Sequence, residues 1–141
     1  MLMGEEENAV QAKIMKYMNL AGVNADFPIV KQSIAFRINS KGIKGRKSTL
    51  PAGFPDILSI ISLHGKAIPM FIEVKAPNKK CTNNLQLAFI KDMEQRGCFA
   101  CWANNLQMVK DYIRQKILNI YANDVKKEEQ STGITNSVKQ K

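Results

Sequence analysis

Three stretches of the chain repeat apolar residues every three or four positions, which is the period of a helix with one buried face. They are residues 5–21, 84–96 and 105–122. Gly22 and Gly97 follow the first two stretches, at the position where a helix commonly ends. Thr82 or Asn83 stands where the second stretch needs a capping residue. The pattern therefore predicts three helices.

Four shorter segments are strongly apolar or alternate between apolar and polar residues, which predicts β-strands. They are residues 34–39, 56–63, 67–74 and 98–103. His64 and Gly65 separate the second segment from the third, so we expect a hairpin there. Pro69 indicates that the start of the third strand lies at an edge or outside the ladder, because proline has no N–H to donate.

The predicted order, α-β-β-β-α-β-α, is that of an α/β fold with a mixed β-sheet flanked by helices. A chain of 141 residues fits one domain, which we place at residues 1–122. Residues 123–141 are polar and are predicted to form a flexible tail. No apolar run approaches the ~18 residues of a membrane span. The acidic N-terminus and the odd count of three cysteines favour a cytoplasmic protein over a secreted one.

Charge is concentrated in one part of the chain. The net charge is +9, and residues 31–80 contain ten basic and two acidic residues, a net charge of +8. Such clustering is typical of a surface that binds nucleic-acid phosphates. The two acids of this window are Asp56 and Glu73. Because a phosphate-binding surface repels carboxylates, a bound cation would explain their presence.

The predicted hairpin brings these two acids together. Asp56 opens one strand, and Glu73 and Lys75 close the next on one face of the sheet, while Val74 points to the other face. Two carboxylates offer the hard oxygen ligands that Mg²⁺ prefers, and the backbone carbonyl of Val74 would add a third. Lys75 would hold or deprotonate a water and stabilise charge on a scissile phosphate. The arrangement predicts phosphodiester hydrolysis.

Pro55-Asp56 followed by Glu73-Val74-Lys75 resembles the signature of the PD-(D/E)xK nuclease superfamily. Further features resemble its virus-type replication-repair nuclease branch, the VRR-NUC domain, in the same order over residues 5–115. They are Glu7 four residues before Gln11, the run FRINSKG at 36–42, the step Gly53-Phe54-Pro55-Asp56, the run FIEVK at 71–75, Gln86 and Gly97. The resemblance implies a restriction-endonuclease-like core.

The resemblance also implies a Mg²⁺-dependent DNA endonuclease in which Mn²⁺ can substitute, acting in replication, repair or recombination. Stand-alone members of this size are similar to homodimeric enzymes that cut branched DNA such as Holliday junctions. Asp56 and Glu73 would be the metal ligands, Lys75 the catalytic lysine, and Gln86 a residue that steadies the site or the attacking water. Glu7 would complete the acidic set and help to hold a second metal. The run Glu5–Glu7 offers three candidates, and the spacing to Gln11 favours Glu7.

The alternative is a non-catalytic, basic DNA-binding module with a nuclease-like fold, in which Asp56 and Glu73 only pair with lysines. A protein–protein adaptor has no positive support. Cys98 and Cys101 would face opposite sides of a strand, so we expect core packing and not a zinc site, and Cys81 has no cysteine partner nearby in sequence. The residues expected to contact DNA are Arg37, Lys41, Lys44, Arg46, Lys47, Lys79 and Lys80.

Overall fold

The computed structural model describes residues 4–20, 22–38 and 50–139. The chain divides into two compact units, Met1–Lys110 and Asp111–Lys141, which are described separately. None of the helices in the described part of the chain combines the length and the hydrophobicity that a membrane span requires.

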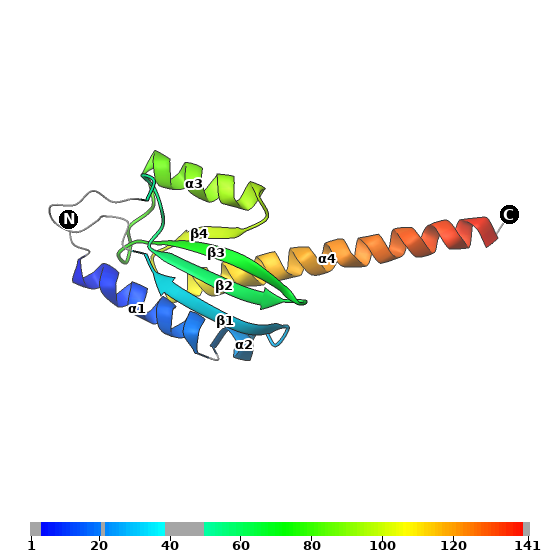
Figure 1. Ribbon diagram of the computed structural model, residues 1–141, viewed down its shortest axis with the longest axis horizontal. Helices are drawn as coiled ribbons and strands as arrows, with labels where there is room; N and C mark the ends of the chain where they lie inside the picture. Colours follow the sequence, from blue (N-terminus) through cyan, green and yellow to red (C-terminus); the bar gives the residue numbers. More distant parts are fainter. Residues whose placement is uncertain (1–3, 21, 39–49, 140–141) are drawn as a thin grey trace. The chain divides into compact units, whose positions relative to one another are not determined.

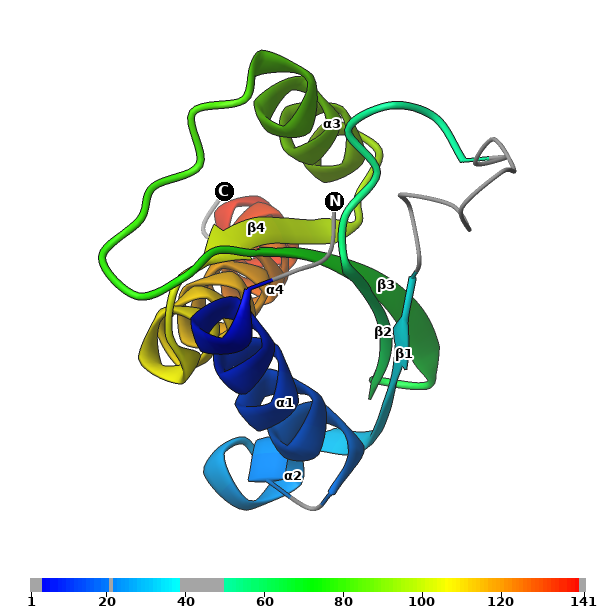
Figure 2. The same ribbon diagram turned by 90° about the vertical axis from the view of Figure 1, so that its left-hand side faces the viewer.

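A mixed four-stranded sheet forms the centre of the first unit (Figures 1 and 2). Its spatial order follows the sequence: β1 (Val30–Arg37), β2 (Ile57–Leu63), β3 (Lys66–Val74) and β4 (Phe99–Ala103). The first three strands are antiparallel neighbours, and β4 pairs with β3 in parallel. The predicted α/β class with a mixed sheet is therefore confirmed.

Helices cover the two faces of this sheet. Figure 2 shows α1 (Glu5–Asn19) and α3 (Asn84–Gln95) on opposite sides of it. The apolar face of α1 is buried, with Ile14 and Met18 fully inaccessible to solvent, and α1 contacts β1 and β3. Phe89 of α3 packs on Phe71 of β3 with ring centroids 5.3 Å apart. Alternation along β3 therefore sends Phe71 and Glu73 towards α3 and Ile72 and Val74 into the opposite, fully buried layer.

The hairpin between β2 and β3 forms as predicted. His64 and Gly65 have φ angles of 51° and 73°, the left-handed values that a tight two-residue hairpin turn requires. Pro69 lies within β3, opposite Ile60 of β2. On its other side β4 begins to pair only at Met70, so the proline occupies a stretch of β3 that has no β4 neighbour in the register. The prediction that the start of β3 is an edge is therefore confirmed.

Two strand and helix ends and one additional helix are the main differences from the predictions. β1 begins at Val30 and not at residue 34, because its polar Lys31 and Gln32 lie exposed on the outermost strand. A five-residue helix, α2 (Gly22–Asp26), follows α1 and was not predicted, since it is too short to show a helical period. α4 (Leu106–Lys139) continues past the predicted end at residue 122. Residues 123–132 contain neither proline nor glycine, so nothing in the sequence stops the helix there.

Part of the outer edge of β1 is covered by side chains of the preceding helical segment. The side-chain amide of Asn19 makes two hydrogen bonds with the backbone of Ala35. Its Oδ1 accepts from the N–H of Ala35 at 2.8 Å, and its Nδ2 donates to the carbonyl of Ala35 at 3.2 Å. Asn24 Nδ2 donates to the carbonyl of Val30. At Ala35 and Val30, these amides therefore occupy backbone groups that a further strand would use.

Part of the sheet face on the α3 side remains open. The side chains of Ile34, Phe36 and Ile60 on β1 and β2 are 47%, 46% and 36% exposed. Ile34 lies directly opposite Ile60 in the register, so these residues form one continuous apolar patch next to the aromatic contact between Phe71 and Phe89.

Candidate functional site

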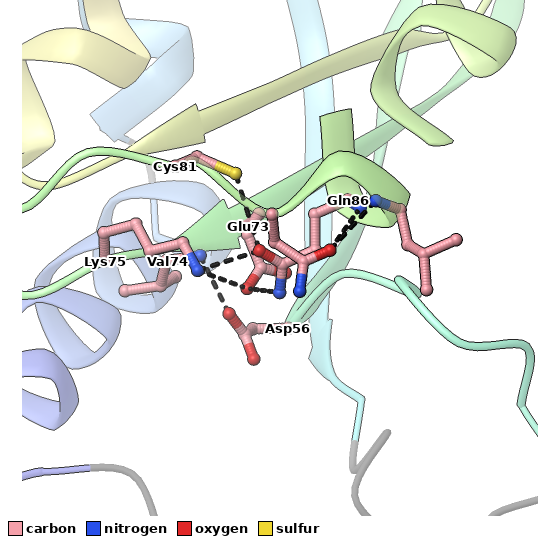
Figure 3. Close-up of polar contacts among 8 residues, drawn as sticks. Asp56, Glu73, Val74, Lys75, Cys81 and Gln86 are labelled. Carbon is pink, nitrogen blue, oxygen red and sulfur yellow. Dashed lines mark hydrogen bonds and ion pairs between the residues drawn. The ribbon is translucent and has the colours of Figure 1, made fainter. Parts of the chain in front are cut away.

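Two acidic side chains meet at the end of the hairpin. Asp56 directly precedes β2, and Glu73 is the second-last residue of β3. Ile57 is opposite Ile72 in the register, which places Asp56 beside Glu73. Both are buried, with 7% and 5% of their surface exposed. Asp56 Oδ2 accepts a hydrogen bond of 2.8 Å from the backbone N–H of Val74 (Figure 3), so one acid is fixed by the strand that carries the other.

Lys75 and Gln86 join this pair through a short chain of polar contacts (Figure 3). Lys75 Nζ lies 3.5 Å from Glu73 Oε1 and donates a 2.8 Å hydrogen bond to Gln86 Oε1. Gln86 Nε2 in turn donates to Glu73 Oε1 at 2.7 Å. The structure thus brings four sequence-predicted site residues, Asp56, Glu73, Lys75 and Gln86, into one cluster that spans β3 and the first turn of α3.

The surroundings of Glu73 in this cluster disfavour the ionised form of its carboxyl group. Burial, and after it the negative charge of Asp56, raises the pKa of Glu73 from 4.5 to about 8, and the nearby Lys75 only partly offsets this. Glu73 Oε2 is fully buried and has no hydrogen-bond partner. A buried acceptor without a donor is costly, and such groups mark functional positions.

This orphaned oxygen is consistent with a divalent cation. Glu73 Oε2 and the Asp56 carboxylate supply hard oxygen donors, and the cation would satisfy the acceptor that the protein leaves unpaired. Within the residues that the structure describes, no group of three His, Cys, Asp or Glu side chains gathers as a metal site. The cluster therefore contains two carboxylates, and Glu7 does not join it as a third.

Glu7 lies instead beside a neighbouring cavity of about 470 Å³. The cavity runs between the start of α1 and the loop after β3, and its lining includes Glu5, Glu6, Glu7, Lys75 and Lys79. Lys75 therefore connects the buried acid pair to this more open space. All three candidate glutamates reach the cavity, and Glu7 is the least exposed of them.

The structure places only some of the residues predicted to contact DNA. Arg37 is exposed at the end of β1, and Lys79 and Lys80 are exposed in the loop after β3. Lys79 lines the cavity beside Glu5–Glu7. The remaining four, Lys41, Lys44, Arg46 and Lys47, lie outside the described residues.

The first turn of α3, which carries Gln86, is fixed from two sides. Asn83 caps the helix by accepting hydrogen bonds from the backbone N–H groups of Leu85 and Gln86, at 2.9 and 3.1 Å. Of the two predicted capping residues, Asn83 is therefore the one used. Gly53 has a φ of +86°, and a Cβ there would lie 2.8 Å from the carbonyl of Leu85. Only glycine lets the segment before Asp56 approach the helix this closely.

The sequence interpretation missed one member of the cluster. Cys81 is 6% exposed, and its thiol donates to Gln86 Oε1 at 3.5 Å. Its sequence position, five residues before Gln86 and without a second cysteine nearby, gave no signal of this contact. Cys101, by contrast, is a buried core residue as predicted.

Comparison with family models matches residues 5–105 to the model described as VRR-NUC domain. No curated protein and no solved structure matches the chain.

Proposed function

The chain belongs to the VRR-NUC domain family, and from this premise we propose that it is a metal-dependent DNA endonuclease. The family implies a nuclease of the PD-(D/E)xK type, with DNA as the partner. The observation that carries the proposal is the buried pair of Asp56 and Glu73 with an unpartnered carboxylate oxygen, next to Lys75 and Gln86. Burying two carboxyl groups next to each other destabilises a fold, so such a pair is expected to serve a function.

We propose Mg²⁺ as the cofactor, with Mn²⁺ able to substitute. Asp56, Glu73 and the backbone carbonyl of Val74 would hold it, and Glu7 would act from the neighbouring cavity, at a second metal. Bound Mg²⁺ would supply Lewis-acid activation of the scissile phosphate and a lower pKa for the attacking water. The support for this ligand set is the orphaned Glu73 Oε2.

Lys75 and Gln86 would prepare the water and the phosphate. Lys75 contacts Glu73 and also lines the open cavity, which supports a role in which its Nζ would hold the attacking water and stabilise negative charge on the phosphate. Gln86 accepts from Lys75 and donates to Glu73, which keeps both side chains in a single arrangement. The residues Arg37, Lys79 and Lys80, with the basic segment 41–47, would grip the flanking DNA backbone.

The finer proposal is a homodimer that cuts branched DNA in replication, repair or recombination. A two-fold pair of sites suits a junction with two equivalent strands. The open patch of Ile34, Phe36 and Ile60 offers apolar surface for a second copy. Sedimentation equilibrium of the full chain tests the dimer, and cleavage of a matched panel of junctions, flaps and linear duplexes tests the substrate. A monomer that prefers linear duplex would contradict this finer proposal.

Cleavage of labelled DNA with Mg²⁺, with Mn²⁺ and with EDTA tests the central proposal. We expect cutting with either metal and none in EDTA. Salt-sensitive DNA binding without turnover under any metal would favour the non-catalytic DNA-binding module instead.

A further inference from the structure

The orientation of the Gln86 amide decides how the cluster works. Its Oε1 faces Lys75 Nζ at 2.8 Å, and its Nε2 faces Glu73 Oε1 at 2.7 Å. An amide turned by 180° would point its N–H donors at the amine of Lys75, donor against donor. Lys75 would then lose the acceptor that places it. Groups that hold Gln86 in the observed orientation therefore also hold Lys75.

Cys81 is such a group. Its thiol lies 3.5 Å from Gln86 Oε1, on the same end of the amide that receives Lys75 (Figure 3). Two donors, Cys81 and Lys75, thus converge on one oxygen, and both would oppose a turned amide. Cys81 remains a donor at neutral pH because burial raises the pKa of its thiol above the usual value of a cysteine.

The position of Cys81 in the fold stabilises its contact with Gln86. It is buried within the first unit and lies two residues before Asn83, the capping residue of α3. Asn83 fixes the backbone of Gln86, which leaves the side-chain torsions free. The cap and the thiol therefore restrain different parts of the same residue.

We propose that Cys81 is a positioning residue of the nuclease site, which orients the Gln86 amide so that Gln86 places Lys75 beside Glu73. The inference rests on the proposed function and adds a residue that the sequence interpretation had left to packing. It predicts that what matters at position 81 is a hydrogen-bond donor and not sulfur chemistry.

The test compares Cys81→Ala, which removes the donor, with Cys81→Ser, which keeps a donor of similar size. Cys98→Ala is the matched control, because Cys98 is a partly buried free thiol outside the cluster. We expect Cys81→Ala to lower kcat roughly 2- to 10-fold, the value of one hydrogen bond, with unchanged KM for DNA. Cys81→Ser and Cys98→Ala should retain wild-type kcat.

A second measurement is independent of cleavage. In the metal-free full-length chain, the side-chain NH₂ resonances of Gln86, assigned by their absence in Gln86→Glu, should broaden or shift in Cys81→Ala and stay near wild type in Cys81→Ser. An active wild type whose Cys81→Ala variant has the same kcat and the same Gln86 resonances would overturn the inference. So would a Cys81→Ser variant that loses as much kcat as Cys81→Ala. Failure of the proposed function is distinguishable, because it appears as a wild type that cleaves no DNA with either metal.

Discussion

The carboxylate of Asp56, one residue before β2, accepts a 2.8 Å hydrogen bond from the backbone N–H of Val74 at the end of β3. This bond makes the spacing between the two acids a property of the hairpin and not of flexible side chains. The neighbouring acid, Glu73, keeps a buried Oε2 that has no hydrogen-bond donor. The hairpin thereby holds both acids in place before any ligand arrives, as a pre-organised site requires.

Asp56→Asn tests the role of this carboxylate with little change in shape, since the amide oxygen can still accept from Val74. The loss of a negative ligand should lower DNA cleavage at least about 100-fold while binding to DNA in EDTA is unchanged. Turnover assays and fluorescence anisotropy measure the two effects. Asp92→Asn, at an exposed carboxylate on α3, is the matched control and should behave as wild type. Wild-type turnover in Asp56→Asn would remove Asp56 from the mechanism.

Glu73→Gln should make the metal-free protein more stable in alkaline solution. The pKa of Glu73 is raised from 4.5 to about 8 in the folded chain, so the fold retains a proton that the unfolded chain releases. Its contribution to stability is complete below pH 4.5 and is lost as the pH rises through about 8. Glutamine is neutral throughout and can donate to Asp56. At pH 9 its Tm should exceed that of wild type by several degrees, since each pKa unit is about 1.4 kcal/mol.

Thermal unfolding followed by circular dichroism in EDTA, at several pH values, measures this difference. Glu128→Gln, at an exposed position of α4, is the control and should not change the pH profile. Parallel Tm profiles for wild type and Glu73→Gln would show that Glu73 is ionised in the folded protein at neutral pH.

Binding of Mg²⁺ should release a proton. Below pH 8 the metal has to displace the proton from Glu73, so affinity should rise about tenfold per pH unit and level off above pH 8. Calorimetry at pH 7 in two buffers of different ionisation enthalpy counts the protons released, and we expect close to one per site. Equal affinity at pH 6.5 and pH 8.5 would contradict both the ligand role and the raised pKa.

Gly53→Ala should destabilise the chain more than Gly65→Ala. Both glycines have positive φ angles, of 86° and 73°, so alanine costs about 1 kcal/mol of backbone strain at either position. At Gly65 the added methyl meets nothing within 4 Å, but at Gly53 it lies 2.8 Å from the Leu85 carbonyl. The displacement of α3 adds about 1–3 kcal/mol. Urea unfolding compares the two variants, and an equal loss would show that the close approach is unimportant.

The order of elements along the chain and the site hairpin were predictable because they follow from local patterns. The alternation around Asp56 and Glu73, together with the His64-Gly65 turn, determines which residues of the two strands face each other. The contact of Cys81 with Gln86 was not predictable. It depends on how the loop after β3 folds back, and the spacing of apolar residues does not indicate the path of that loop. The separation of Glu7 from the acid pair likewise depends on how α1 packs on the sheet. The order of residues in the sequence does not predict the distance between Glu7 and the two acids.

The amide of Asn19 on Ala35 has a consequence for how the protein behaves at high concentration. A sheet whose last strand presents free backbone groups acts as a template on which other chains can deposit, and cross-β growth begins at such sites. Asn19 and Asn24 occupy such groups at Ala35 and Val30 within the same molecule, which disfavours extension of the sheet by a second copy at these positions of β1. These two asparagines therefore protect part of this edge against the backbone pairing from which cross-β growth would start.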